Sequence, residues 1–329
     1  MSELLDELLT PILPLLEDPE VEEICVNSPT STYIYKSGRF IQVDIPGLDA
    51  ELIEEIAWIA GAERRMDVDE QNPILDTDLK GRGRICACVY PMTEDGRSSL
   101  TVRRGAPIWP TYEELAQRGL FNAVQHKKND VVNPRLIELY RAKQWAEFFP
   151  LGVAEGLNIL GAGVTAAGKT YLMRAGIRAI PDPNTRVITI QDTAELQELE
   201  QFFPNSVQLF YDSSGKGPTA GKLVATAMRM RPEKLILQEV RDGTAGVAYI
   251  YALQTGHKGF TTIHADSCAG AFDRLRYVIK ETPKGAAIAD DDLMAQLRSL
   301  IDVVVHSSRV GNRFAVDEVW FRHAQPITQ

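Results

Sequence analysis

The pattern of apolar and polar positions divides the chain into two parts with different architectures. In the first part, short apolar runs and one stretch of helical spacing are separated by turn residues such as Gly38 and Gly96. The predicted elements, in chain order, are a hairpin of strands 32–35 and 40–43, a helix over 51–62, and strands at 85–90 and 99–103. Strands joined by short turns, with one helix among them, predict a mixed α+β domain over residues 1–128.

In the second part, apolar runs of strand length alternate with stretches of helical spacing, beyond a polar segment at 126–130 that marks the domain boundary. The predicted elements are a helix over 133–149, a strand at 157–160, a helix over 171–178, strands at 186–190 and 234–237, and a final hairpin of strands 303–306 and 314–316. This alternation predicts a parallel sheet covered by helices on both faces, in an α/β domain over residues 129–329. Such sheets bind ligands at the carboxyl ends of their strands.

The N-terminal segment is apolar on one helical face and acidic elsewhere. Its leucine-rich stripe runs from Leu4 to Leu16, with interruptions at Pro11 and Pro14, and no basic residue precedes Lys36. Helices that lie on membrane surfaces carry Lys and Arg on their polar face. We therefore expect this segment to pack on its own domain or on a partner subunit rather than on a membrane.

Composition and charge exclude several classes of protein. A net charge of −10 argues against a dedicated binder of duplex DNA, so we expect no direct sequence-specific nucleic-acid binding. No apolar run approaches the roughly 18 residues of a membrane span, and no signal peptide is recognisable, so we expect a cytoplasmic protein. The four cysteines include no C-x-x-C pair, which argues against a zinc ribbon and a disulfide framework.

A phosphate-binding loop lies between the strand at 157–160 and the helix over 171–178. It matches G-x-x-x-x-G-K-[ST], and its residues are Gly163, Val164, Thr165, Ala166, Ala167, Gly168, Lys169 and Thr170, followed by Tyr171. Backbone N–H groups of such a loop, and the positive end of the following helix, face phosphate oxygens. We therefore predict that the chain binds a nucleoside triphosphate, with Lys169 at the terminal phosphates and the Thr170 hydroxyl on Mg²⁺.

Two core strands of the second part are followed closely by acidic residues. Asp192 and Glu195 follow the strand at 186–190, and Glu239 follows the strand at 234–237. A carboxylate at the end of the second nucleotide-binding strand polarises the attacking water or holds Mg²⁺ through a water. Glu239 is therefore a candidate for that function.

Linked motifs after the loop make the chain resemble the secretion-motor ATPases. The motifs, in order, are Gln191-Asp192-Thr193-Ala194-Glu195-Leu196, Met228-Arg229-Met230-Arg231-Pro232-Glu233, Glu239-Val240-Arg241-Asp242, and Thr255-Gly256-His257 followed by Thr261-Thr262-Ile263-His264. This order is that of the hexameric traffic ATPases of type IV secretion and conjugation, and of their relatives in type II secretion and type IV pili. The compact first domain and the lack of a four-cysteine zinc insertion favour the type IV secretion branch, with a type IV pilus or type II secretion motor as the alternative.

The resemblance implies a RecA-like P-loop NTPase domain at the C-terminus with a smaller α+β domain at the N-terminus. It implies ATP hydrolysis by a homo-hexamer, with ATP and Mg²⁺ bound in each subunit. It also implies docking on inner-membrane secretion-apparatus proteins, without a spanning segment, at the cytoplasmic face of the bacterial inner membrane. There the ring would power substrate transfer or pilus assembly.

The resemblance also assigns functions to single residues. It implies that Glu239 is the catalytic carboxylate and that His257 and His264 form a histidine box near the γ-phosphate. It further implies that Arg84 and Arg103 of the first domain reach the phosphates and draw that domain over the nucleotide.

The chain departs from the family pattern in three places. Gln191 stands where the family's aspartate box opens with Glu, Gln238 stands where a Gly precedes the catalytic glutamate, and Ala166-Ala167 replaces a frequent Gly-Ser. Because a carboxamide takes up no proton, Asp192 or Glu195 would hold water or Mg²⁺ instead. Gln191 and the Ala166-Ala167 pair favour a second hypothesis, a nucleotide-gated assembly scaffold with marginal turnover. A kinase is a third, for which no acceptor site is evident.

Overall fold

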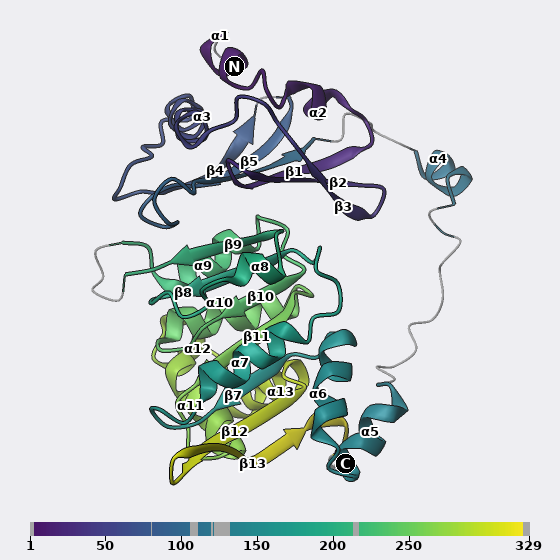
Figure 1. Ribbon diagram of the computed structural model, residues 1–329, viewed down its shortest axis with the longest axis vertical. Helices are drawn as coiled ribbons and strands as arrows, with labels where there is room; N and C mark the ends of the chain where they lie inside the picture. The colour runs from purple at the N-terminus through teal and green to yellow at the C-terminus, as the bar shows by residue number, and fades with distance from the viewer. Residues whose placement is uncertain are drawn as a thin grey trace.

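The computed structural model describes residues 3–79, 81–105, 111–119, 121, 132–212 and 217–324. These residues form two β-sheets, each with its own helices (Figure 1). The expected domain boundary between residues 128 and 129 lies outside the described residues. None of the described helices is both long enough and apolar enough to cross a membrane.

The N-terminal sheet has six antiparallel strands in the order β3-β2-β1-β6-β5-β4. The elements of this part are α1 (Glu3–Leu8), α2 (Leu13–Glu17), β1 (Val21–Ser28), β2 (Ser31–Lys36), β3 (Arg39–Val43), α3 (Ala50–Ala62), β4 (Ile74–Leu79), β5 (Gly83–Cys88), β6 (Ser99–Arg104) and α4 (Tyr112–Gln117). The predicted hairpin and helix are confirmed as β2–β3 and α3, which begins after a cap in which the Asp49 carboxylate accepts from the Leu52 N–H at 2.8 Å. Leu5 and Leu9 share the core with Ile53 of α3, so the N-terminal segment packs on its own domain, as expected.

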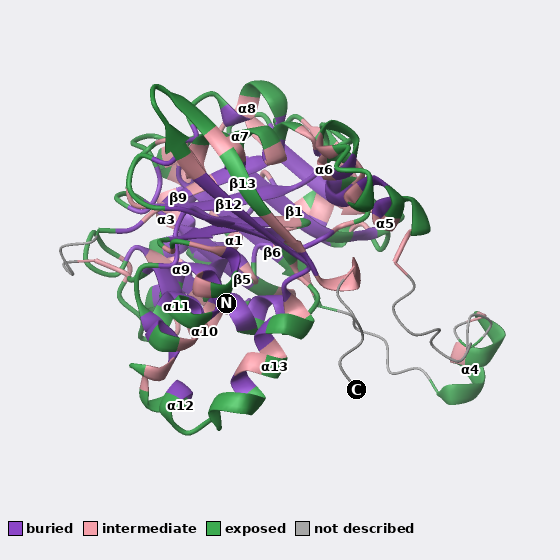
Figure 2. Ribbon diagram, turned by 90° about the horizontal axis from the view of Figure 1, so that it is seen from below, coloured by how far each residue is buried: buried purple, intermediate pink, exposed green. Residues whose placement is uncertain are grey.

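The C-terminal sheet has seven strands in the order β13-β12-β7-β11-β10-β8-β9, and all are parallel except the edge strand β13. Its elements are α5 (Pro134–Arg141), α6 (Trp145–Ala154), β7 (Ile159–Ala162), α7 (Lys169–Arg178), β8 (Val187–Gln191), α8 (Leu199–Phe202), β9 (Ser206–Phe210), α9 (Ala220–Ala227), β10 (Lys234–Leu237), α10 (Gly243–Gln254), β11 (Lys258–Ile263), α11 (Cys268–Lys280), α12 (Pro283–Ala286), α13 (Asp290–Leu300), β12 (Val303–Val310), β13 (Arg313–Phe321) and the 3₁₀ turn η1 (Arg322–Ala324). One apolar cluster packs α9, α10, α11 and α13 on one face of the sheet, and another packs α5, α6 and α7 on the other. The predicted parallel sheet with two covered faces is confirmed, and Figure 2 shows its central strands buried.

The single helix predicted over 133–149 is wrong, because the structure has two helices there. The chain leaves α5 at Lys143, which has a left-handed φ of 55°, and α6 starts two residues later at Trp145. Leu139 of α5 and Phe148 of α6 then both reach the same apolar cluster. The turn allows this shared burial, which outweighs the cost of one strained backbone residue.

A buried arginine joins the two sheets. Arg186 precedes β8 and is fully buried, and its guanidinium donates to the side-chain oxygens of Asn27 and Asn205 and, at 2.7 Å, to the carbonyl oxygen of Met230. Because Asn27 lies in β1, this network fixes the N-terminal sheet to the C-terminal one. The N-terminal sheet therefore lies at the β9 edge, whereas β7 lies four positions further along the C-terminal sheet (Figure 1).

Candidate active site

The phosphate-binding loop connects the carboxyl end of β7 to α7, and several of its residues have a left-handed backbone conformation. Gly168, the N-cap of α7, has φ +87°, and Ala166 has φ 59°. At Gly163 the chain passes so close to the final hairpin that a Cβ there would lie 2.6 Å from the carbonyl oxygen of Ser307. Left-handed residues interspersed in a loop turn successive N–H groups to one side, so this backbone suits an anion.

Lys169 and Thr170 open α7 and carry the loop's reactive side chains. The Lys169 ammonium donates to the carbonyl oxygens of Gly163 at 3.0 Å and Val164 at 3.2 Å. Burial lowers the pKa of Lys169 from its usual value, although the charge of Glu239 acts in the opposite direction. The Thr170 hydroxyl donates to a carboxylate oxygen of Glu195 at 2.7 Å.

The carboxyl ends of β8, β10 and β11 bring the acidic and histidine residues to the same place. Glu239 is 7% exposed, and one of its oxygens lies 2.8 Å from His264 Nε2. The other ring nitrogen of His264, Nδ1, lies 3.2 Å from Lys169 Nζ. The structure therefore brings together five of the residues that the sequence named as candidates, which are Lys169, Thr170, Glu195, Glu239 and His264.

Arg241 also belongs to this cluster, although no function was predicted for it from the sequence. Its Nε lies 3.2 Å from the second carboxylate oxygen of Glu239, and its guanidinium also pairs with Asp192. The arginine therefore bridges the two acidic strand ends. The signal was present in the motif Glu239-Val240-Arg241-Asp242, where the arginine follows the carboxylate by two residues.

Gln191 lies in the core rather than among the groups of the site. It is fully buried, its amide nitrogen donates to Thr189 Oγ1 and Gln208 Oε1, each at 3.0 Å, and its side-chain oxygen accepts from the Leu196 N–H at 3.0 Å. A carboxylate could not donate these bonds. The glutamine therefore fits a structural position, and its inability to take up a proton has no bearing on the cluster around Glu239.

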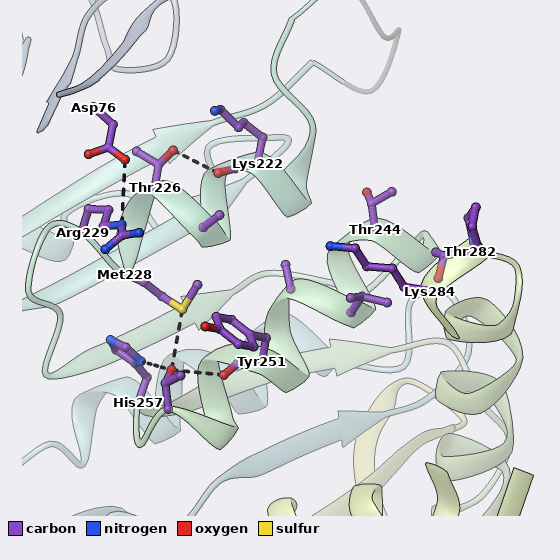
Figure 3. A pocket seen from close by; sticks show the side chains of 15 residues that line it. Asp76, Lys222, Thr226, Met228, Arg229, Thr244, Tyr251, His257, Thr282 and Lys284 are labelled. Carbon is purple, nitrogen blue, oxygen red and sulfur yellow. Dashed lines mark hydrogen bonds and ion pairs between the residues drawn. The ribbon is translucent and has the colours of Figure 1, made fainter. Parts of the chain in front are cut away.

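His257 does not join His264, contrary to the expectation that both lie near the γ-phosphate. The two residues flank opposite ends of the six-residue strand β11, which places them about 20 Å apart. His257 Nδ1 lies 3.0 Å from Thr255 Oγ1 and 3.2 Å from the carbonyl oxygen of Ala252. It stands at one end of a groove of about 920 Å³ along α9 and α10, beside Met228 (Figure 3).

Arg84 and Arg103 also lie away from the phosphate-binding loop of their own chain. They line a cavity of about 320 Å³ between the N-terminal sheet and the segment after α9, and the cavity's other basic residues are Arg229, Arg231 and His257. Arg84 makes two bonds to the Asp76 carboxylate, at 2.8 and 3.0 Å. The expected closure of the N-terminal domain over its own nucleotide is therefore not the arrangement seen, because the Arg186 network holds that domain at the β9 edge.

Among the described residues, no group of three His, Cys, Asp or Glu side chains is arranged to hold a metal ion. Magnesium in nucleotide sites takes only one or two protein ligands and completes its shell with phosphate oxygens and water. The oxygens near the loop are the Thr170 hydroxyl and the carboxylates of Asp192, Glu195 and Glu239. This donor set suits such a magnesium site.

Comparison with known proteins gives a family and a structural match. The sequence profile of the family "Type II/IV secretion system protein" matches residues 6–310. The type IV secretion system protein VirB11 of Bartonella quintana is 34% identical over 95% of this chain and 91% of its own length. Protein VirB11 of Agrobacterium fabrum is 33% identical over 95% of this chain and 92% of its own.

A solved structure covers nearly the whole molecule. It is the crystal structure of the VirB11 ATPase from the Brucella suis type IV secretion system in complex with sulphate. It is 30% identical and superposes with a TM-score of 0.90 over 96% of this chain and 94% of that one. The predicted fold, a RecA-like P-loop domain with a smaller α+β domain before it, is therefore confirmed.

Proposed function

Because the chain belongs to the type II/IV secretion system protein family and to its VirB11 branch, we propose that it is a hexameric motor that hydrolyses ATP to power substrate transfer or pilus assembly by a type IV secretion or conjugation system. The observation that carries this proposal is the convergence of Lys169, Thr170, Glu239 and His264 at the carboxyl end of one sheet. The family resemblance expected from the sequence motifs is confirmed at the level of the branch.

Binding of the nucleotide rests on the loop and on Lys169. The backbone N–H groups of residues 163–168 would hold the phosphate oxygens, and the N-terminal end of α7 adds a favourable dipole. Lys169 now donates to two loop carbonyls, so its ammonium is already positioned over the loop. Thr170, with Asp192 or Glu195, would hold Mg²⁺, which when bound neutralises charge on the phosphates.

Hydrolysis would use Glu239 to orient water and accept its proton. Burial leaves few waters to compete for the carboxylate, Arg241 donates to one of its oxygens, and His264 Nε2 lies 2.8 Å from the other. His264 lies between Lys169 and Glu239, so it contacts both the residue expected at the terminal phosphate and the candidate catalytic residue. A change at the terminal phosphate would therefore alter the contacts of His264 and, through it, the end of β11.

The test of hydrolysis is steady-state phosphate release by the purified protein beside Glu239→Gln. If the protein is a motor, the rate of phosphate release falls about 10³-fold in the variant, because the glutamine accepts no proton. The scaffold alternative is favoured by one observation, that Arg241 already pairs with one Glu239 oxygen while His264 lies 2.8 Å from the other. Equal rates for the two proteins would support the scaffold and reject the motor.

We further propose that Arg84 and Arg103 act on the nucleotide of a neighbouring subunit. Guanidinium groups suit phosphate oxygens, and these two lie on a basic cavity distant from their own loop. A heterologous contact that repeats around a closed ring would bring one subunit's arginines to the next subunit's loop. Hexamer formation and this assignment therefore support each other.

Mixing two inactive variants tests action between subunits. Lys169→Ala keeps the arginines, and the double variant Arg84→Ala/Arg103→Ala keeps the loop. Rings assembled from an equal mixture would regain about a quarter of the wild-type rate, since half the loops are intact and half of those meet intact arginines. No recovery would contradict the assignment. Mixing Lys169→Ala with Glu239→Gln is the control, because both lesions lie in one site and no recovery is expected.

The remaining proposals concern assembly. The ring would dock on inner-membrane secretion-apparatus proteins as a peripheral protein of the cytoplasmic face, without sequence-specific contact with nucleic acid, in keeping with the net charge of −10. Mass photometry with a nonhydrolysable ATP analogue tests the ring directly. A hexameric mass supports the proposal, and a monomer under all nucleotide conditions rejects it.

A further inference from the structure

Two exposed aromatic side chains lie beside the phosphate-binding loop. Tyr171 of α7 is 70% exposed and Phe314 of β13 is 52% exposed, and their ring centroids are 6.1 Å apart with planes inclined by 35°. Val164, Val310 and Val316 are exposed large apolar residues of the same loop and hairpin, and β13 is exposed along most of its length (Figure 2). Exposed apolar surface gathered at one place is typical of a binding site.

The hairpin places Phe314 directly against the loop. A Cβ at Gly168 would lie 2.8 Å from Phe314 Cγ and 2.9 Å from Cδ1, so the ring covers the last glycine before Lys169. Tyr171 follows Thr170, the residue expected at Mg²⁺, by one position. The guanidinium of Arg309 lies 5.9 Å from the centre of the Phe314 ring. The aromatic pair therefore flanks the helix end of the loop.

The occupant of this surface can be inferred from the nucleotide whose phosphates the loop is proposed to bind. A nucleotide anchored by its phosphates carries its base on a short ribose tether, so the base must rest on a surface close to the loop. A base has two flat faces, and stacking on an aromatic ring stabilises any base because every base has a π-face. Phe314 and Tyr171 offer such a surface, and Arg309 adds a planar cation beside it.

We propose that Phe314, together with Tyr171, forms the platform on which the nucleobase of the bound nucleotide stacks. This rests on the proposed function, because it requires a nucleotide on the loop. It adds a base-binding residue from the C-terminal hairpin, an element that none of the phosphate-site motifs includes. A second copy of the chain covering the same surface is the competing occupant.

The experiment compares two ligands that differ only in the nucleoside. Isothermal titration calorimetry with Mg²⁺-ADP and with Mg²⁺-pyrophosphate is run on the wild type, Phe314→Ala, Phe314→Trp and Tyr277→Ala. Tyr277 is the matched control, a 57% exposed aromatic residue on α11. We expect Phe314→Ala to weaken ADP binding about tenfold and to leave pyrophosphate binding unchanged, with Phe314→Trp and Tyr277→Ala close to the wild type.

Three results would overturn the platform. Equal weakening of ADP and pyrophosphate in Phe314→Ala means that the ring only supports the loop. Unchanged ADP binding means that another occupant, such as a second copy, covers the patch. If the wild type binds pyrophosphate as tightly as ADP, the loop holds phosphate without any base platform. Failure of the wild type to bind either ligand is a separate result, because it rejects the proposed function itself together with the platform.

Discussion

The carboxyl end of the C-terminal sheet and the basic cavity under the N-terminal sheet both hold residues that the family motifs relate to one nucleotide. At the sheet end, Lys169, His264 and Glu239 form a chain of contacts of 3.2 and 2.8 Å within one subunit. In the cavity, Arg84 and Arg103 line a space that includes none of the loop residues. The first region is assembled within a single chain, whereas we propose that the second acts on the nucleotide of a neighbouring subunit.

The difference shows what fixes each region. Residues at the sheet end are positioned by strand order, because parallel strands deliver their carboxyl ends to one edge. The cavity is positioned by the docking of two sheets through Arg186 and its partners. Changes at the sheet end should therefore affect chemistry, and changes at the docking network should affect stability.

The largest expected effect is the loss of ATP hydrolysis when Lys169 at the sheet end is replaced. Lys169→Ala removes the ammonium over the loop and should lower phosphate release by about 10³-fold or more. Lys284→Ala, in the groove along α10, is the control, since that lysine is exposed and distant from the loop. A steady-state phosphate assay measures both. Normal turnover by Lys169→Ala would remove the loop from the mechanism.

The next effect tests the docking network. Arg186→Met keeps much of the side-chain volume but leaves the Asn27 side-chain oxygen and the Met230 carbonyl without their buried donor. Each buried acceptor left without a donor costs about 1–3 kcal/mol of stability. Removal of the buried charge offsets part of this cost, so we expect the free energy of unfolding to fall by about 2–3 kcal/mol.

Urea denaturation measures this loss, with Arg135→Met as the control. Arg135 is exposed and pairs only with the exposed Glu138 and Glu147 within the part of the chain that the structure describes, so its replacement should change stability by no more than about 0.5 kcal/mol. If the two variants unfold alike, the buried network does not hold the sheets together.

A smaller effect distinguishes the two histidines of the T-G-H…T-x-H motif. His264→Ala should lower kcat roughly 30-fold, because the imidazole links Lys169 to Glu239. His257→Ala should lower it about twofold at most, because His257 bonds only Thr255 and Ala252 among the described residues. Equal losses in a turnover assay would mean that both histidines act on one nucleotide across a subunit boundary, which would join the two regions.

The sequence predicted the sheet end well because its determinants are local. Eight contiguous residues define the loop, and each acidic partner follows a recognisable apolar strand. The basic cavity could not be assigned in this way. His257 and His264 belong to one sequence motif, but which end of β11 each occupies depends on where the strand begins. The cavity that Arg84 and Arg103 line depends on how the two sheets dock.

The rest of the fold shows the same limit. No glycine or proline separates α5 from α6, so the sequence predicts one helix there, and the break lies at the left-handed Lys143. The apolar positions change face at this break, from Leu136 and Leu139 before it to Trp145 and Phe148 after it. Nor could the sequence place Phe314 on Gly168, since that contact requires the final hairpin to fold back over a loop distant in the chain.

The smallest expected effect is on the free energy of unfolding, which the partly buried charge of Lys169 lowers. Burial lowers the pKa of Lys169, so the folded protein holds that proton less tightly than the unfolded chain does. The charged ammonium therefore destabilises the folded state at pH 7, and this cost disappears as pH rises through the folded pKa toward the unfolded value of about 10.4. Lys169→Met removes the charge and keeps the methylene packing, so it should be more stable than the wild type at pH 7, by less than about 1 kcal/mol because the side chain is only partly buried.

Urea unfolding at pH 7 and at pH 9.5 tests the sign as well as the size of this effect. The advantage of Lys169→Met should shrink at the higher pH, where part of the wild-type population has already lost the proton. Lys222→Met on α9 is the matched control, since Lys222 is exposed and should show no difference at either pH. A Lys169→Met protein that is less stable than the wild type at pH 7 would show that the bonds of the ammonium to Gly163 and Val164 outweigh its desolvation, and the loop would then depend on this lysine for its folded shape.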